Sequence, residues 1–352
     1  MKKIIMTGGG TAGHVMPCLA LVPELTARGY EIYYIGTYNG IEKGLVEEKG
    51  LPYFGISSGK LRRYFSLKNF TDPFRVIKGY FEAKKIIKKI KPDVIFSKGG
   101  FATVPVTFAA HEYHIPVISH ESDITPGLAN RLCIKKADYI CTGFKETLKF
   151  LPKNKGIYTG SPIRAELLNG DTEKGYRFTG FNGNKPIILI IGGSTGSAKI
   201  NESIYNVLPT LLKNYDVIHI TGKGKNNPEY ENLRGYKSFE YVGMELPDVF
   251  AVSDLVISRA GANSICELLA LNKPNILIPL SAAQSRGDQI LNADSFEKQG
   301  FSYVLREEEI TNESLLEAIS YVLSNKEKYI NAMKQSISNN AIKNIVDIIT
   351  RY

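Results

Sequence analysis

The 352-residue sequence contains few cysteines and no long apolar run. Its cysteines, Cys18, Cys133, Cys141 and Cys266, have neither a paired nor a metal-ligand spacing, so we expect ordinary buried thiols. No window approaches 18 uninterrupted apolar residues, which excludes a transmembrane helix. The apolar run at residues 2–6 is too short for a signal peptide. These absences predict a protein that stays in the cytoplasm.

A second absence concerns dinucleotide binding. Residues 2–6 predict a strand, the glycines at residues 8–13 that follow match G-x-G-x-x-G, and a helix is expected to begin near Pro17. A dinucleotide site also needs an acidic residue at the end of the second strand, but that strand, residues 32–35, ends in Gly36 and Thr37. NAD and FAD are therefore disfavoured. His14, which closes the loop, either caps and packs locally or lies at the mouth of an active-site cleft.

The chain is long enough for two domains, and 43% of its residues are hydrophobic. Apolar strands alternate with helical stretches, which predicts parallel sheets covered by helices. The apolar strand at residues 187–191 is followed by a second glycine-rich loop, so the plan of the N-terminus is repeated. We predict similar domains at residues 1–163 and 164–335, with a cleft between them as the active site. A last helix at residues 336–352 can cross back to the first domain.

The positive charge is concentrated in one segment. Residues 60–91 contain eleven Lys or Arg against two acidic residues, which accounts for the net charge of +9. From Pro73 onward, an apolar stripe predicts a docked helix with a solvated basic face; it comprises Val76, Tyr80, Ala83, Ile87 and Ile90. The aromatic and basic residues 61–70 before it match the surface of an anionic membrane.

Residues 257–293 combine the groups that a nucleotide site needs. A strand ends at Ile257, the chain turns on Gly261, and a helix follows that Asn263 or Ser264 can cap, with free N–H groups for an anion. Glu267, one turn into this helix, lies among apolar residues and suits two ribose hydroxyls. A simpler interpretation makes Gly261 only a turn and Glu267 a solvated helix residue.

Six motifs follow one another in a characteristic order: GGGTAGH at residue 8, SKGGF at 97, HESDITPGLAN at 120, TGSPIR at 159, GGSTGS at 192 and SRAGANSICE at 258. In this order they resemble the MurG family, which adds N-acetylglucosamine to lipid I. The resemblance implies a GT-B fold, an α/β protein with two Rossmann-like domains that face each other across a cleft. It also implies that the first domain binds acceptor and membrane, and the second UDP-N-acetylglucosamine.

The same resemblance assigns site residues. The first loop would close over the donor phosphates, and its histidine, His14, is a candidate for the general base or for a partner of the phosphates, with Glu121 in reserve as base. The residues assigned to substrate binding are Thr11, Ala12, Gly13, Arg164, Ser194, Ala262, Asn263, Ser264, Glu267 and Gln289. Of these, Ala262 to Ser264 would hold uracil and phosphates, Glu267 the ribose and Gln289 the sugar hydroxyls.

The chain departs from the family pattern at two places, residues 122–123 and Asp288. Ser122 and Asp123 stand where the family often has Gln and Asn, and Asp288 stands where it often has Gln or His. A carboxylate accepts hydrogen bonds from sugar hydroxyls but cannot donate them. These two positions therefore do not identify the donor sugar.

The implied reaction is an inverting transfer that makes lipid II for peptidoglycan synthesis at the cytoplasmic face of the bacterial membrane. The sequence has no Asp-x-Asp pair for a metal, so we expect no metal and no other cofactor. Arg164, the N–H groups of residues 193–195 and a helix N-terminus would balance the leaving diphosphate. Nucleic acid is not an expected partner.

Three alternatives remain at this point: a diacylglycerol glycosyltransferase of the same fold, a UDP-sugar 2-epimerase, and a membrane scaffold that binds nucleotide sugars without catalysis. The epimerase would not need the basic aromatic segment. The scaffold would not need His14.

Overall fold

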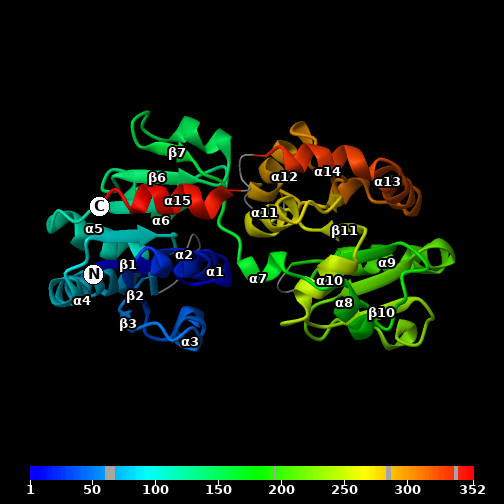
Figure 1. Ribbon diagram of the computed structural model, residues 1–352, viewed down its shortest axis with the longest axis horizontal. Helices are drawn as coiled ribbons and strands as arrows, with labels where there is room; N and C mark the ends of the chain where they lie inside the picture. Colours follow the sequence, from blue (N-terminus) through cyan, green and yellow to red (C-terminus); the bar gives the residue numbers. More distant parts are fainter. Residues whose placement is uncertain (60–67, 194–195, 283–286, 337–339) are drawn as a thin grey trace. The chain divides into compact units, whose positions relative to one another are not determined.

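The computed structural model describes residues 1–59, 68–193, 196–282, 287–336 and 340–352, with only the backbone for residues 68–71. The chain divides into two compact units, each built on one parallel sheet (Figure 1). Unit 1 comprises Met1–Arg164 and Asn340–Tyr352, and unit 2 comprises Ala165–Asn339. The predicted class, an α/β protein with two Rossmann-like domains, is confirmed.

The sheet of unit 1 has the strand order β3-β2-β1-β4-β5-β6-β7, and every neighbouring pair is parallel. Its strands are β1 (Lys2–Thr7), β2 (Tyr30–Thr37), β3 (Tyr53–Ile56), β4 (Val94–Ser97), β5 (Val117–Glu121), β6 (Tyr139–Thr142) and β7 (Gly156–Tyr158). Because all strands run the same way, their carboxyl ends meet at one edge of the sheet, where ligands bind in such folds.

Helices cover both faces of this sheet. The helices of unit 1 are α1 (Ala12–Leu19), α2 (Val22–Ala27), α3 (Ile41–Glu48), α4 (Lys68–Ile90), α5 (Thr103–Glu112), α6 (Leu128–Cys133), the 3₁₀ helix η1 (Lys145–Phe150) and α15 (Ala341–Ile349). Residues of α1, α2 and α15 share a buried cluster with β1 and β2, whereas α4 and α5 pack in a second cluster.

The last helix, α15, belongs to the core of unit 1. Its Ile345 and Ile349 are fully buried in the cluster that also contains Leu25 of α2. At the surface, Arg28 Nη2 lies 3.4 Å from Asp347 Oδ1. The chain therefore leaves unit 1 after Arg164 and returns to it at Asn340.

The sheet of unit 2 is also parallel, with the strand order β10-β9-β8-β11-β12-β13. Its strands are β8 (Ile187–Ile191), β9 (Asp216–Ile220), β10 (Tyr236–Phe239), β11 (Leu255–Ser258), β12 (Asn275–Leu277) and β13 (Tyr303–Val304). Its helices are α7 (Ala165–Leu168), α8 (Thr172–Thr179), α9 (Ala198–Asn214), η2 (Pro228–Tyr230), α10 (Leu246–Val252), α11 (Ala262–Ala270), α12 (Asp288–Lys298), η3 (Glu307–Glu309), α13 (Asn312–Ser324) and α14 (Lys326–Lys334).

The helix expected near Pro17 starts earlier than the sequence indicated. Helix α1 begins at Ala12 and includes Pro17. Proline lacks an N–H group and favours a first turn, which suggested a start near that residue. The extended backbone of Thr11 begins the helix instead, so His14 lies within its first turn.

Of the apolar stripe predicted on α4, Ala83, Ile87 and Ile90 lie in the core and Tyr80 packs against it, whereas Val76 is only partly buried. All four cysteines are buried and none forms a disulfide. In the described part of the chain, no helix has the length and apolar character needed to cross a membrane.

Candidate active site residues in the two units

The first glycine loop of unit 1 joins β1 to α1. Gly10 has φ +88°, a conformation that residues with a Cβ rarely adopt. Thr11 and Ala12 are exposed at the start of α1, and no side chain caps this helix. Thr11, Ala12 and Gly13, which were assigned to phosphate binding, therefore lie where the first glycine loop meets the first turn of α1.

The contacts of His14 determine its tautomer. Its Nδ1 lies 3.1 Å from the carbonyl oxygen of Gly9 and 3.1 Å from Thr11 Oγ1. Because a carbonyl only accepts, Nδ1 carries the proton and Nε2 keeps its lone pair. Burial and, to a smaller extent, the charge of Lys98 lower the pKa of His14 to about 4, against the opposing effects of the Gly9 hydrogen bond and Glu42. His14 is therefore neutral at pH 7, with Nε2 as its basic atom.

Glu121, the reserve candidate for the base, is engaged by its own loop. Its Oε1 accepts from the backbone N–H of Asp123 at 3.0 Å. Its Oε2 accepts from the N–H of Gly127 at 2.9 Å and from Asn130 Nδ2 at 2.8 Å. Burial raises the pKa of this carboxyl group above its ordinary value. With both oxygens occupied, Glu121 shapes the loop between β5 and α6.

Lys98, to which the sequence analysis gave no role, is buried beneath these loops with an exposed fraction of 1%. It follows β4, and its Nζ donates to Ser122 Oγ. Ser122 is one of the residues that depart from the family pattern. In this chain the serine therefore ties the second glycine turn, at residues 97–102, to the loop after β5.

In unit 2, α11 starts directly at the predicted turn. Gly261 is its N-cap, without a side-chain hydrogen bond, and Ala262, Asn263 and Ser264 form its first turn. The prediction that Asn263 or Ser264 caps the helix is wrong, because the backbone already turns into the helix at Gly261. Gly261 itself has no side chain that could cap the N–H groups at this end. Glu267 lies in the second turn and is partly buried.

A pocket of about 400 Å³ opens beside the glycine loop that follows β8 in unit 2. Gln289 is among its lining residues, and its Oε1 accepts from the backbone N–H of Leu280 at 3.0 Å. The other residues that line it are Gly192, Gly196, Ser197, Ala198, Lys199, Arg259 and Leu280. The loop itself needs glycine, since a Cβ at Gly196 would lie 2.0 Å from the carbonyl oxygen of Thr221.

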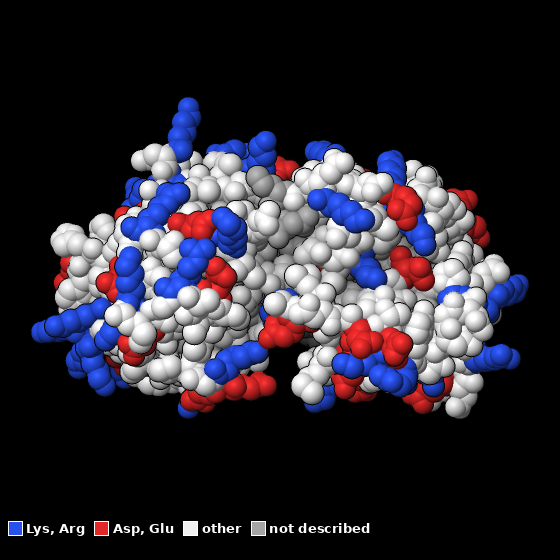
Figure 2. All heavy atoms as spheres, in the orientation of Figure 1, with Lys and Arg blue, Asp and Glu red and all other residues white. Residues whose placement is uncertain are grey.

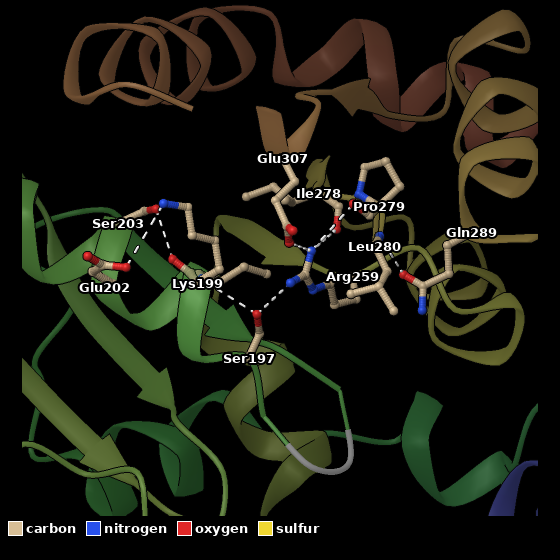
Figure 3. Close-up of polar contacts among 11 residues, drawn as sticks. Ser197, Lys199, Glu202, Ser203, Arg259, Ile278, Pro279, Leu280, Gln289 and Glu307 are labelled. Carbon is tan, nitrogen blue, oxygen red and sulfur yellow. Dashed lines mark hydrogen bonds and ion pairs between the residues drawn. The ribbon is translucent and has the colours of Figure 1, made fainter. Parts of the chain in front are cut away.

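Arg259 organises this pocket and was missed by the sequence analysis, although it lies within the SRAGANSICE motif. Its Nη2 donates to Ser197 Oγ at 2.7 Å, and its Nη1 donates to the carbonyl oxygen of Ile278 at 3.2 Å (Figure 3). Nη1 also forms an ion pair with Glu307. Arg259 thus joins the start of α9 to the ends of β11 and β12. An arginine directly after a buried strand is the signal that could have revealed it.

Two of the remaining predicted positions need a comment. Arg164 is partly exposed at the last position of the continuous part of unit 1, and its guanidinium has no partner among the described residues. Ser194 lies outside the described residues. In the described ranges, no group of three or more His, Cys, Asp or Glu side chains could hold a metal ion.

Comparisons with known proteins show the family to which the chain belongs. Residues 4–142 match the glycosyltransferase family 28 N-terminal domain, and residues 187–350 match its C-terminal domain. The chain is 60% identical, over 99% of its length and 98% of the relative, to the UDP-N-acetylglucosamine--N-acetylmuramyl-(pentapeptide) pyrophosphoryl-undecaprenol N-acetylglucosamine transferase of Lachnoclostridium phytofermentans. The transferase of the same name from Clostridium perfringens (strain SM101) is 58% identical, over 99% of this chain and 98% of the relative.

Among solved structures, MurG of Acinetobacter baumannii superimposes with a TM-score of 0.76 at 24% identity, over 100% of both chains. A UDP-GlcNAc 2-epimerase from Neisseria meningitidis, bound to UDP-GlcNAc, gives a TM-score of 0.71 at 16% identity, also over 100% of both chains. Fold and loops together define the class as the two-domain GT-B proteins, which includes transferases and epimerases. Within that class, the chain belongs to glycosyltransferase family 28 and, in it, to the MurG family.

We predict that Arg259→Met destabilises unit 2. The side chains of Arg259 and Glu307 are only 10% and 9% exposed, so the variant leaves a buried carboxylate without its ion pair. Breaking such a pair from one side costs about 3 to 5 kcal/mol. Urea denaturation followed by circular dichroism measures the loss.

The matched control is Arg259→Met combined with Glu307→Met, which removes both charges. It should recover a large part of the stability, because no unpaired charge remains. If both variants are as stable as the parent, the ion pair does not hold the pocket together.

Proposed function

We propose that this protein transfers N-acetylglucosamine from UDP-N-acetylglucosamine to lipid I, undecaprenyl-pyrophosphoryl-N-acetylmuramyl-pentapeptide, and so makes lipid II for peptidoglycan synthesis. The observation that carries the proposal is the 60% identity to a transferase named for this reaction, over nearly the whole of both chains. The fold alone supports less, because a 2-epimerase has it too.

We assign donor binding to unit 2. The N–H groups of Ala262, Asn263 and Ser264 at the start of α11 would hold uracil and phosphate, and Glu267 in the next turn would accept from the ribose hydroxyls. Gln289 uses its Oε1 on Leu280, so its Nε2 is the group that would donate to a sugar hydroxyl.

The leaving diphosphate needs positive partners. Helix α9 has 17 residues, and it starts at the second glycine loop, so the positive end of its dipole lies beside the pocket. The resemblance adds Ser194 and Arg164, together with Thr11, Ala12 and Gly13 from the first loop. These groups would stabilise charge that grows on the diphosphate in the transition state.

His14 is the proposed general base. The acceptor hydroxyl oxygen attacks the anomeric carbon from the face opposite UDP, its proton passes to His14 Nε2, and the bond between that carbon and the UDP oxygen breaks. Nε2 suits this role because Nδ1–H is held by Gly9, so the lone pair of Nε2 is the one left to accept a proton. Glu121 is the weaker candidate, because its oxygens already accept three hydrogen bonds.

The test of the function is a transfer assay with UDP-[¹⁴C]N-acetylglucosamine and either lipid I or diacylglycerol. We expect label in lipid I only, with release of one UDP per sugar transferred. Label in diacylglycerol would support the related lipid glycosyltransferase instead. Conversion of the donor to its 2-epimer without an acceptor would overturn the transferase proposal.

For His14→Ala we predict a loss of turnover of about 10²- to 10⁴-fold at saturating substrates, because a general base contributes that much. The KM for the donor should change little, since the base acts in the transition state. Near-normal kcat would exclude His14 as the base.

The same assignment predicts the pH dependence of the parent. A pKa of about 4 leaves His14 unprotonated from pH 5.5 to 8, so kcat should show no histidine titration near 6.5 in that range. The rate should fall only as the pH approaches 4, where the imidazolium forms.

We also propose that unit 1 binds the cytoplasmic face of the membrane, where lipid I lies. Most of the predicted basic aromatic segment, residues 61–70, lies outside the described residues. Helix α4, however, exposes Phe74, Ile77 and Phe81 by 74%, 54% and 56%, at helical spacing. Lys78 and Lys85 are exposed at positions of the same stripe.

Figure 2 shows Lys and Arg side chains gathered at the left of the view, where Figure 1 places α4. Apolar and cationic groups together suit an anionic lipid surface.

We predict that replacing Phe74, Ile77 and Phe81 by Ser releases the protein from vesicles that contain anionic lipid, as measured by sedimentation. The exposed side chains are not part of the core, so the thermal midpoint should stay near that of the parent. A control variant with Tyr241→Ser and Met244→Ser removes apolar side chains that are 79% and 92% exposed in unit 2. If both variants sediment like the parent, α4 is not the membrane-binding helix.

A further inference from the structure

We propose that Glu42 is a positioning residue for His14, acting through the peptide group between Gly9 and Gly10. This inference rests on the proposed role of His14 as the base. The carboxylate of Glu42 holds and polarises the peptide group, which in turn holds Nδ1 of the imidazole. Neither the motifs nor the comparisons assign a role to Glu42.

One peptide group joins the two side chains. The N–H of Gly10 donates to Glu42 Oε2 at 3.2 Å. The carbonyl of Gly9, which belongs to the same planar peptide group, accepts from His14 Nδ1 at 3.1 Å. Hydrogen bonds in such a chain polarise one another, so a negative charge at the N–H end makes the carbonyl a better acceptor. The arrangement favours the tautomer that leaves Nε2 free.

Glu42 itself is held rigidly. It lies in the first turn of α3 and is fully buried. Its Oε1 accepts from the backbone N–H and the Oγ1 of Thr37, at 2.8 and 2.6 Å. Because Thr37 ends β2, the carboxylate connects the sheet to the glycine loop.

The surrounding glycines make room for this carboxylate. A Cβ at Gly9 would lie 2.7 Å from Glu42 Oε1, and one at Gly40 would lie 2.1 Å from it. At Gly36 a Cβ would lie 2.7 Å from Glu42 Cγ. Three glycines from three segments therefore converge on one side chain, which shows that the loop is packed around it.

The charge state fits the role. Burial alone would raise the pKa of Glu42, but the hydrogen bonds from Thr37 and Gly10 outweigh it and lower the pKa below its ordinary value. Glu42 is therefore ionised at neutral pH. A dinucleotide site would place a carboxylate at the end of β2 to bind a ribose. Here the carboxylate near that end is Glu42, which is buried and accepts hydrogen bonds from Thr37 and Gly10.

Glu42→Gln tests the proposal with little change in shape. A carboxamide has a single acceptor oxygen, which we expect to remain with the two donors of Thr37 and so to leave the N–H of Gly10 without its acceptor. We expect kcat to fall roughly 10- to 100-fold, a part of the general-base contribution. The KM for UDP-N-acetylglucosamine should change less than kcat, because the proposed contacts to uracil, ribose and sugar lie in unit 2 and the first loop would contact only the diphosphate.

A spectroscopic measurement reports on the imidazole directly. Protein labelled with ¹⁵N-histidine should show His14 as the Nδ1–H tautomer, and His14→Gln identifies its signals among the five histidines. In Glu42→Gln the signals should shift towards a mixture of tautomers. Thr37→Val, which removes one donor to Oε1 but keeps the Gly10 contact, is the matched control and should leave tautomer and kcat near those of the parent.

The double variant with His14→Ala separates positioning from folding. If Glu42 acts through His14, Glu42→Gln should cost little further activity in the His14→Ala background. An equal loss in both backgrounds, or an unchanged kcat and tautomer in the single variant, would overturn the proposal. Should Glu42→Gln fail to fold, Glu42→Asp keeps the charge but shortens its reach, and the same two readouts decide.

The failure of this inference can be told apart from failure of the proposed base. If His14→Ala retains turnover, His14 is not the base, whatever Glu42 does. If His14→Ala loses turnover while Glu42→Gln keeps both kcat and tautomer, the base stands and the positioning role falls.

Discussion

Parallel strand pairing is the constraint on which both units depend. In each sheet all strands run the same way, so the loops after their carboxyl ends gather at one edge. The glycine loop after β1, the turn after β4 and the loop after β5 meet at this edge in unit 1. In unit 2 the loops after β8, β11 and β12 do the same. Apart from Glu42, which lies in α3 after β2, every residue to which we assign a role in the reaction lies in these loops, in the helices that start from them, or at the link after unit 1.

The glycine loops, to which we propose phosphate binding, are not held by an apolar core alone. In this protein, buried charges and short hydrogen-bonded links hold them. Glu42 holds the first glycine loop, Lys98 joins Ser122, and Arg259 bonds Ser197 and the loop after β12. Each of these groups is buried, so its bonds are shielded from water and its loss would leave polar partners unsatisfied.

The neutral state of His14 follows from the same packing. The imidazole lies close to the buried cation Lys98, and burial disfavours its charged form, so its pKa falls to about 4. Glu42 opposes this effect and, through the Gly9–Gly10 peptide group, orients the ring. The balance leaves an imidazole that has the correct protonation state at neutral pH but is not made more basic by its surroundings.

The sequence by itself determined the fold class, the order of the motifs and the family, because strand periodicity, glycine turns and motif spacing are local properties of the chain. It also indicated His14 and Glu267 as candidates from their places in those motifs. It could not give the start of α1 or the cap of α11, where the backbone conformations of Thr11 and Gly261 decided. Only the tertiary structure revealed Glu42, Lys98 and Arg259 as residues that hold the loops. Their partners Gly10, Ser122 and Glu307 are distant in the sequence, and such pairs form only when packing brings separate strands and helices together.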